Sequence, residues 1–586
     1  MVLGIDERKK LLEVSRGERA ADLFIKGGKL VNVYSSEIYE ADVAVYRGRI
    51  AHVGKGLDAV GPDTTVLDAG GKYIVPGYIE PHGHPWNIYP PDVLARVILP
   101  LGTTSLIGEN LLLYLKAELD GFKKTMDRLA ENPLRFWWMV RVAAQSPTPD
   151  EETLFSREAI AELLKNPRVV SIAELTRWPT IYRGEENVLA AIAEAELCGK
   201  RVDGHTAGCS YEKLNAVVAG GITSCHESIT REEVLERLRL GLWVILRHSS
   251  LRQDLPELLK AVTEKGLPTH RMMLTTDASM PYFTDNFGFI DGLLRLAVEE
   301  GLDPVQAIAM VTLNPATYFG LEKEIGGIAP GRRADILLLP DLKTFVPETV
   351  MVGGRVVAQQ GELKVDIPNI DWKELNLTGD FEANSPIGDP DTYSVFASGN
   401  QINFPVIDLI KNVITRRRDT VLPVANGRVD LERCPGMLYC SLVDRRGNWV
   451  ANGVIYNFAR EIGGMASSFN TAGELLVIGK NQRDMALAAR RVAEMGGGIV
   501  LSEEGKILFE MPLAIGGVMS AEPPQKILSS LKILAELVER RGYPYHDLLY
   551  TLLFLPGDFL PQIRITRLGV MDIKTGEVLH SSRRLR

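Results

Sequence analysis

Residues 73–110, YIVPGYIEPHGHPWNIYPPDVLARVILPLGTTSLIGEN, place an apolar strand-like stretch, a helical stretch and a second apolar stretch one after another. Such strand-then-helix units recur about eight times over about 250 residues, which is typical of a (β/α)8 barrel, an α/β fold. A doubly wound open sheet has the same alternation and is the competing fold. We predict the barrel, over 75–324, because polar residues end several of the strands, and in a barrel these ends meet on one face.

The segments on either side of the predicted barrel contain short alternating stretches that read as strands. DLFIKGGKLVNV (22–33) precedes the barrel and TVMVGGRVVAQQGEL (349–363) follows it. We predict that 1–74 and 325–370 form one small β-sandwich; an independent second small domain is the alternative. Residues 371–399, rich in Asp, Asn, Pro and Gly, predict a linker. Residues 400–586 mix strands and helices and predict a C-terminal α+β domain.

Composition narrows the class of protein. The 586 residues include 66 Lys and Arg against 75 Asp and Glu, a net charge of −9, so nothing favours nucleic acid or an anionic lipid surface as a partner. Five cysteines suit a reducing compartment rather than a disulfide framework. The charged N-terminus is unlike a signal peptide, and no apolar stretch approaches the length of a membrane span. We therefore predict a cytoplasmic protein with no membrane partner.

Four histidines and two carboxylates share one property, since each stands at the end of a predicted barrel strand. They are His82, His84, Glu174, His205, His226 and Asp277. His82 and His84 are two residues apart, so on a strand they point to the same face and can bind one metal ion. Taken singly, each residue is more often an ordinary core or surface residue, but their joint occurrence predicts a metal site.

The other histidines give no such signal. His248 also follows a strand and is ambiguous. Four more follow no pattern, and we interpret them as structural or exposed: His52, His270, His546 and His580.

Several motifs resemble a known family. VPGYIEPHGH (75–84) and GGIAPGRRADILLL (326–339) resemble the amidohydrolase superfamily. Within this superfamily, the chain resembles the adenine deaminases at three motifs: DGHTAG (203–208), CHESITREEVLERLRLG (225–241) and GLDPVQAIAMVTLNPATYFGL (301–321). The resemblance continues into the C-terminal region at DMALAARRVAEMGGGIVL (484–501), PLAIGGVMSAEP (512–523) and LLFLPGD (552–558). It therefore covers nearly the whole chain.

The resemblance implies a role for each strand-end residue. His82 and His84 would hold the more buried metal ion, His205 and His226 would hold a second, and Glu174 would bridge the two. Asp277 would touch the first metal and transfer protons. Glu227 is a candidate for protonating a ring nitrogen, with a carboxylate at a helix N-terminus as the alternative interpretation.

The resemblance also implies a reaction. The family is associated with manganese or iron, sometimes zinc, and converts adenine to hypoxanthine and ammonia. A divalent metal lowers the pKa of bound water and supplies a hydroxide that attacks the amine-bearing ring carbon. Asp277 would carry the proton from the attacking water to the leaving amine. The expected partner is a small purine, and a homodimer is expected.

The chain departs from the family pattern at positions expected to contact substrate. PWNIYP (85–90) replaces Ile-Glu-Ser-Ser, Glu109-Asn110 stand where a histidine is expected, and SSFNTAGEL (467–475) lacks the usual His-Asp-Ser-His-Asn run. A divergent subgroup is indicated, so another amino-heterocycle or cyclic amide is the alternative substrate, and an inactive binding scaffold is the third hypothesis. Weaker candidates for substrate contact are Trp86, Trp178, Arg247 and Ser279.

Overall fold

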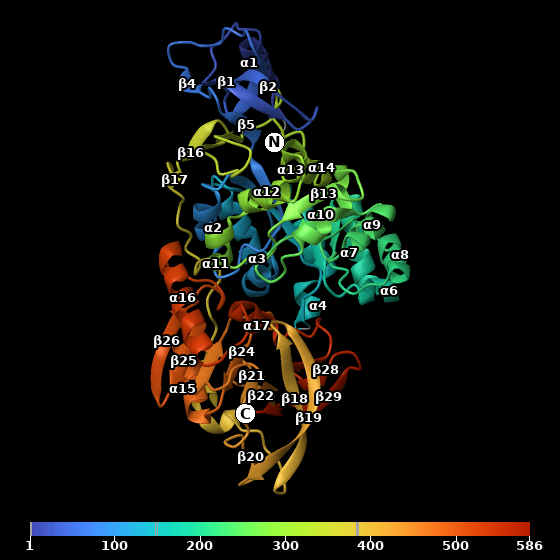
Figure 1. The fold of residues 1–586 in the computed structure, drawn as a ribbon, viewed down its shortest axis with the longest axis vertical. Coiled ribbons are helices and arrows are strands. Elements are labelled where there is room, and N and C mark those ends of the chain that lie inside the picture. The colour runs from blue at the N-terminus through green and yellow to red at the C-terminus, as the bar shows by residue number, and fades with distance from the viewer. Residues whose placement is uncertain (1–2, 147, 149, 383–385, 586) are drawn as a thin grey trace.

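The computed structural model describes residues 3–146, 148, 150–382 and 386–585. The chain is elongated, with an N-terminal sheet at one end, a barrel in the middle and a C-terminal domain at the other end (Figure 1). No helix within the described residues is long and apolar enough to cross a membrane.

Eight parallel strands form the barrel, and each pairs with its neighbour in the sequence, which is not the order of a doubly wound sheet. The prediction of a (β/α)8 barrel is therefore confirmed. The strands are β6 (Tyr78–Gly83), β7 (Thr103–Glu109), β8 (Arg135–Val140), β9 (Val169–Leu175), β10 (Arg201–Gly204), β11 (Ser224–Cys225), β12 (Trp243–Arg247) and β13 (Met272–Thr275). All residues of β7 and β9 are buried, which explains why these strands read as continuous apolar runs.

Side chains close the barrel between its last strand and its first. The hydroxyl of Thr275 on β13 donates to the carbonyl of His82 at 3.0 Å and to Glu80 at 2.5 Å. The backbone amide of Thr276 donates to the other oxygen of Glu80 at 3.0 Å. Glu80 is fully buried on β6, and burial raises the pKa of its carboxyl to about 7. Glu80 thus ties β13 to β6 directly beneath the predicted metal ligands.

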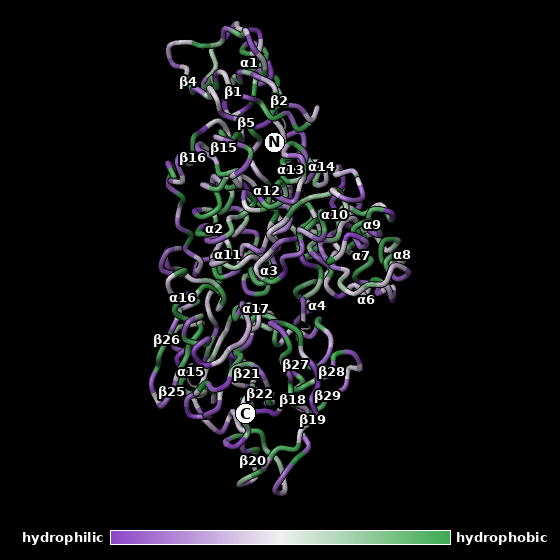
Figure 2. The backbone as a smooth tube through the Cα atoms, in the orientation of Figure 1, coloured by the Kyte–Doolittle hydropathy of each residue, from purple (hydrophilic) through white to green (hydrophobic). Residues whose placement is uncertain are grey.

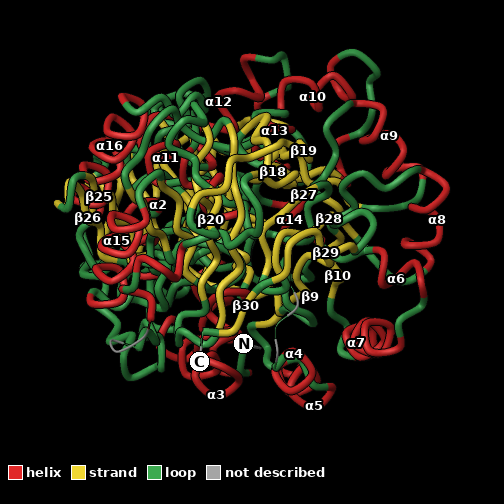
Figure 3. Tube along the Cα trace, turned by 90° about the horizontal axis from the view of Figure 1, so that it is seen from below, coloured by secondary structure: helices red, strands yellow, loops and turns green. Residues whose placement is uncertain are grey.

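Helices follow the barrel strands, and in the view from below α4 to α10 lie along the edge of the molecule (Figure 3). The main ones are α2 (Pro91–Ile98), α3 (Leu111–Leu129), α5 (Arg157–Lys165), α7 (Glu186–Leu197), α8 (Tyr211–Ala219), α9 (Arg231–Arg239), α10 (Leu255–Thr263) and α12 (Ile290–Glu299). Amphipathic spacing turns Leu255, Leu258 and Leu259 of α10 inward, where all three are buried. The largest apolar cluster of the molecule fills the space between strands and helices.

Strands from both flanks of the barrel join one sheet of nine strands. In it, β14 (Ile336–Leu339) pairs antiparallel with β5 (Tyr73–Pro76), so the second flank continues the first. Leu30, Val43 and Met351, from opposite flanks, share one buried cluster, so the two flanks share one core. The other strands are β1 (Leu23–Asn32), β2 (Glu37–Tyr46), β3 (Arg49–Gly54), β4 (Thr65–Asp68), β15 (Thr349–Val352), β16 (Arg355–Gln359) and β17 (Glu362–Leu363), and α1 (Ile5–Ser15) packs beside β3.

The segment predicted as a linker packs against both of its neighbours. The indole of Trp372 is buried and donates to Asp92 of α2 at 3.3 Å. Tyr393 is fully buried and belongs to the apolar cluster of the C-terminal domain. This connection therefore holds the C-terminal domain close to the barrel.

The C-terminal domain contains a ten-stranded sheet and a three-stranded sheet, as an α+β domain should. The large sheet comprises β18 (Gln401–Lys411), β19 (Ile414–Ala425), β20 (Arg428–Val429), β21 (Met437–Val443), β22 (Trp449–Tyr456), β23 (Gly464–Ser467), β24 (Leu475–Gly479), β25 (Gly498–Glu503), β26 (Lys506–Pro512) and β30 (Arg583–Arg584). The small one comprises β27 (Ile563–Thr566), β28 (Gly569–Asp572) and β29 (Glu577–Ser581). Helix α15 (Gln482–Glu494) packs on the large sheet.

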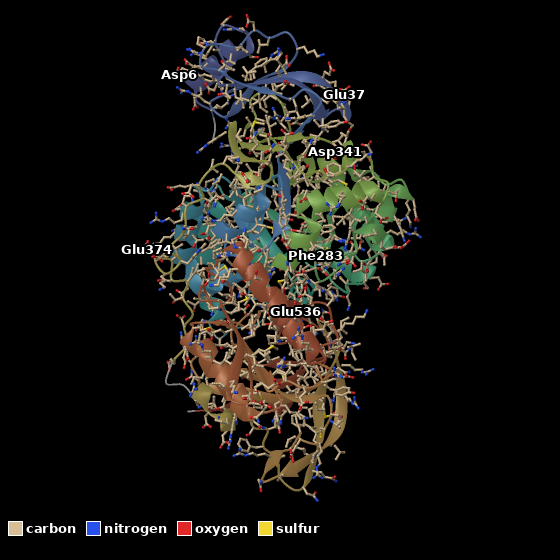
Figure 4. The ribbon with its side chains drawn as sticks, turned by 60° about the vertical axis from the view of Figure 1, so that its left-hand side comes forward. Asp6, Glu37, Phe283, Asp341, Glu374 and Glu536 are labelled. Carbon is tan, nitrogen blue, oxygen red and sulfur yellow. The ribbon has the colours of Figure 1, made fainter. Side chains whose placement is uncertain are left out.

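Two helices of the C-terminal domain reach the barrel. Helix α16 (Pro524–Arg540), which carries Glu536, rises beside α11 (Pro281–Phe287), which carries Phe283 (Figure 4). Lys532 of α16 lies 3.5 Å from Asp285 of α11. Helix α17 (Leu548–Phe554) is coloured green for its apolar residues in Figure 2 and lies between the barrel and the C-terminal sheet. The C-terminal domain therefore covers the face on which the barrel strands end.

Candidate metal centre and substrate cavity

The first group of predicted metal ligands comes from the seam of the barrel. His82 and His84 stand at the end of β6, and Asp277 follows β13. The Oδ1 atom of Asp277 lies 3.7 Å from Nε2 of His82 and 3.0 Å from Nε2 of His84. One potential ligand atom of each residue lies within 4.8 Å of the others. These side chains are arranged as three ligands of one cation would be.

A second group lies beside the first. His205 follows β10 and His226 follows β11, and Nδ1 of His205 lies 3.1 Å from Nε2 of His226. Glu174, at the end of β9, places Oε2 2.8 Å from Nδ1 of His205 and 3.3 Å from Nε2 of His226. Ligand atoms of Glu174, His82 and His226 also lie within 4.8 Å of one another. Here His82 belongs to the first group and His226 to the second. The structure thus brings all six predicted ligands together, with Glu174 between the two groups.

A buried polar atom without a hydrogen-bond partner indicates that the two ligand groups suit a cation. Among the described residues, the buried Nε2 atom of His82 has no hydrogen-bond partner. Buried polar atoms are nearly always paired, and imidazole nitrogens and carboxylate oxygens are the ordinary ligands of divalent transition metals. Glu227 moreover forms a candidate ligand group with His205 and His226. The donor set therefore fits a divalent metal, as expected of the sequence.

Two carboxylates that the sequence did not predict to contact the histidines hold them in place. Oδ2 of Asp203, on β10, lies 2.9 Å from Nδ1 of His82 and 3.5 Å from Nδ1 of His226. Burial alone raises the pKa of Asp203, but the neighbouring His226 and His82 hold it below its ordinary value. Oε2 of Glu109, at the end of β7, lies 3.2 Å from Nδ1 of His84. Each carboxylate thus faces the ring nitrogen that points away from the ligand group.

Arg141 joins the carboxylates of Glu109 and Glu174 beneath the site. Its Nε donates to Oε1 of Glu109 at 2.6 Å, and its Nη2 donates to Oε1 of Glu174. Arg141 is 2% exposed, so this charge is compensated inside the protein. Because Arg141 binds one oxygen of Glu174, only the other oxygen faces His205 and His226. Arg141 follows β8, and no spacing in the sequence pointed to it.

Glu227 lies between two arginines. Its Oε1 is 2.7 Å from Nη1 of Arg247, and its Oε2 is 2.7 Å from Nη1 of Arg252. Burial alone raises the pKa of Glu227, but Arg247, His205 and Arg252 lower it overall. Arg247 also contacts Oδ2 of Asp277 at 2.7 Å. Glu227 is therefore held by two cationic side chains at the cavity, and its role as a proton donor stays a prediction.

A cavity of about 250 Å³ opens onto the ligand groups. From the barrel side it is lined by Trp86, Gln145, Arg247 and Arg252, and His84, Glu174, His205, Glu227 and Asp277 reach it as well. From the C-terminal domain it is lined by Val413, Tyr550, Leu553, Phe554, Phe559 and Leu560. The cavity is therefore charged on one side and apolar on the other, as a pocket for a small ring would be.

The four predicted substrate contacts divide into two pairs. Trp86 and Arg247 line the cavity, and the indole of Trp86 donates to Glu109 at 3.0 Å. Trp178 and Ser279 are not among the lining residues. The indole of Trp178 donates to the carbonyl of Ala207 at 3.2 Å, and the hydroxyl of Ser279 donates to the carbonyl of Thr276 at 2.8 Å. These two side chains bind the backbone of nearby loops, and their contact with substrate stays a prediction.

Gln145 is a cavity residue that sequence reasoning missed. It follows β8, is 5% exposed, and its carboxamide makes no hydrogen bond to another described residue. A buried amide that lacks a protein partner is available to a ligand in the cavity. A loop glutamine carries no signal of its own in a sequence.

His248, which was ambiguous in the sequence, lies outside the ligand groups. Its ring packs against Phe287, with centroids 4.9 Å apart, and burial lowers the pKa of His248 to about 4. It is therefore a neutral core histidine.

Comparisons with known proteins agree with this geometry. Residues 73–357 match the model of the amidohydrolase family, and residues 412–577 match the adenine deaminase C-terminal domain. An adenine deaminase of Moorella thermoacetica is 33% identical over 582 residues, which cover 96% of each chain. An adenine deaminase of a Ruegeria species is 33% identical over 599 residues, 97% of this chain and 96% of its own. A protein of Halalkalibacterium halodurans, named provisionally as an adenine deaminase, is 34% identical over 579 residues, 98% of this chain and 97% of its own.

Proposed function

The chain belongs to the adenine deaminase family of amidohydrolases, and from this premise we propose that it converts adenine to hypoxanthine and ammonia by metal-dependent hydrolysis. One observation carries the proposal: six side chains from the ends of five strands converge on one side of a cavity of about 250 Å³. This reaction belongs to purine salvage.

We assign the ligands as follows. His82, His84 and Asp277 hold one cation, His205 and His226 hold a second, and Glu174 lies between them. Glu227 is a further candidate ligand of the second cation. When bound, divalent metal ions acidify water and so supply a nucleophile at neutral pH. The mixture of carboxylates and imidazoles suits manganese, with iron and zinc as alternatives.

Asp277 is proposed to move the protons of the reaction. Burial alone raises its pKa, but Arg247 and the two histidines of the first group lower it well below its ordinary value, so the carboxylate is ionised and able to accept a proton. Its Oδ1 faces the histidines, and its Oδ2 is held by Arg247. Asp277 can therefore take a proton from water and deliver it to the departing amine.

The walls of the cavity account for binding of a flat ring. Phe554 and Phe559 offer aromatic faces and edges, with centroids 5.7 Å apart, and exclude water together with Leu553 and Leu560. The carboxamide of Gln145, to which no other described residue bonds, can donate and accept at once, the pairing that suits the N6 and N7 atoms of adenine. We propose Gln145 and the apolar wall as the substrate-binding elements, with Trp86 beside them.

A purine panel tests the proposal. The purified chain, supplied with manganese, is incubated with adenine, other aminopurines and cyclic amides, and ammonia is measured. Release of ammonia from adenine is expected. Turnover of a different amine would assign the same chemistry to another substrate, ring opening without ammonia would indicate a cyclic amidase, and metal-free, inactive protein would indicate a binding scaffold. The homodimer and the cytoplasmic location remain predictions of the sequence.

A further inference from the structure

A tyrosine of the C-terminal domain contacts the loop that carries Asp277. The hydroxyl of Tyr550, on α17, donates to the backbone carbonyl of Ala278 at 2.5 Å. Tyr550 is 2% exposed and also lines the cavity. Its ring stacks on that of Phe554, with centroids 5.6 Å apart and an interplanar angle of 15°. The C-terminal domain therefore reaches the residue next to the proposed proton carrier.

The backbone at Asp277 needs such support. Its φ of 52° lies in the left-handed region, which non-glycine residues adopt at a cost and keep only where neighbours enforce it. Within the barrel, the amide of Asp277 donates to the hydroxyl of Thr275 at 2.8 Å. The side chain of Asn87 donates to the same Ala278 carbonyl at 3.0 Å. Two donors, one from each domain, thus fix a single carbonyl directly after the strained residue.

We propose that Tyr550 is a positioning residue that holds Asp277 in its working orientation, so that the C-terminal domain completes the active site of the barrel. The proposal rests on the proposed function of Asp277. Its physical basis is that a carboxylate must be held within a fraction of an ångström to move a proton efficiently. Removing the Tyr550 hydroxyl leaves the Ala278 carbonyl to Asn87 alone and lets the 277–278 segment relax.

Tyr550→Phe tests this, with Tyr545→Phe as the matched control. The hydroxyl of Tyr545 donates to the carbonyl of Leu409 at 2.5 Å, the same kind of bond within the C-terminal domain. For full-length, manganese-loaded Y550F we expect kcat for adenine to fall about tenfold, with KM and metal content within about twofold of wild type. Y545F should keep the wild-type kcat. Equal kcat values in Y550F and wild type would overturn the proposal, as would a rise in KM with kcat unchanged.

A double-mutant cycle and hydrogen exchange separate positioning from a general loss of stability. If Tyr550 and Asn87 act through the same carbonyl, the effects of Y550F and Asn87→Ala on kcat should be non-additive. Backbone amides of residues 276–280 should exchange faster in Y550F than in Y545F. Additive effects with unchanged exchange would refute the proposal. Because exchange needs no turnover, it tests the inference even if adenine is not the substrate, whereas failure of the wild type on adenine counts against the proposed function alone.

Discussion

Replacing Asp203 by Asn should weaken both proposed metal positions with a single change. Oδ2 of Asp203 faces Nδ1 of His82 at 2.9 Å and Nδ1 of His226 at 3.5 Å, and these histidines belong to different ligand groups. Oδ1 accepts from the hydroxyl of Ser224 at 2.6 Å, so asparagine would keep its oxygen there and turn its amide toward the histidines. An amide donor favours the tautomer whose proton sits on Nε2, and that nitrogen then cannot bind a cation.

The size of the effect follows from what such carboxylates contribute elsewhere. Loss of a carboxylate behind a metal-binding histidine typically costs about 10–100-fold in metal affinity, or about 1.4–2.7 kcal/mol for each ion. We therefore expect D203N to retain less than the full complement of metal after dialysis, and to need about 10–100-fold more manganese for half-maximal activity. Elemental analysis and manganese titration measure these two quantities.

Two matched variants make the test specific. Glu109→Gln removes the carboxylate that faces His84. Glu109 also binds Arg141, which holds Glu174, so this variant should weaken the first group more than the second. Asp291→Asn changes another buried aspartate, one that accepts from the amide of Phe289 at 2.7 Å, and should leave metal binding unchanged. If D203N bound two equivalents of manganese with the affinity of wild type, the reasoning on the tautomers would be refuted.

Three further predictions address turnover, binding and stability. Asp277→Asn keeps one side-chain oxygen toward the first cation, so it should retain metal, measured by elemental analysis, yet lose at least about 100-fold in kcat; unchanged activity would remove Asp277 from the mechanism. Gln145→Ala should raise KM for adenine about tenfold with little change in kcat, and an unchanged KM would exclude Gln145 from substrate binding. Glu474 lines a cavity beside the C-terminal sheet, and burial raises the pKa of its carboxyl to about 8. The folded chain therefore holds a proton that the unfolded chain loses above about pH 4.5. Stability should therefore fall as the pH rises from about 4.5 to about 8. Glu474→Gln should be more stable than wild type by at most about 5 kcal/mol at pH 8.5, but not at pH 4.5, as measured by chemical denaturation. Equal pH dependence of the two proteins would contradict this.

Much of the fold was predictable because its signals are local. Alternation of apolar strands with amphipathic helices depends on residues a few positions apart, and it predicted the barrel over 75–324. The joining of the two flanks was predictable for a related reason, since short β-branched stretches must pair with other strands. The packing of 371–399 was not, because the fit of Trp372 against Asp92 depends on two segments distant in the sequence.

The candidate site, like the fold, was predictable from the sequence only in part. The sequence by itself identified the six strand-end residues as candidate ligands, since a closed parallel barrel gathers every strand end on one face whatever lies between the strands. Only the tertiary structure decided what holds those ligands and what covers them: Asp203 and Glu109 behind the histidines, Arg141 beneath Glu174, and Tyr550 over Asp277. These contacts join residues tens to hundreds of positions apart, and they arise from strand register and domain docking, which leave no periodic trace in the chain.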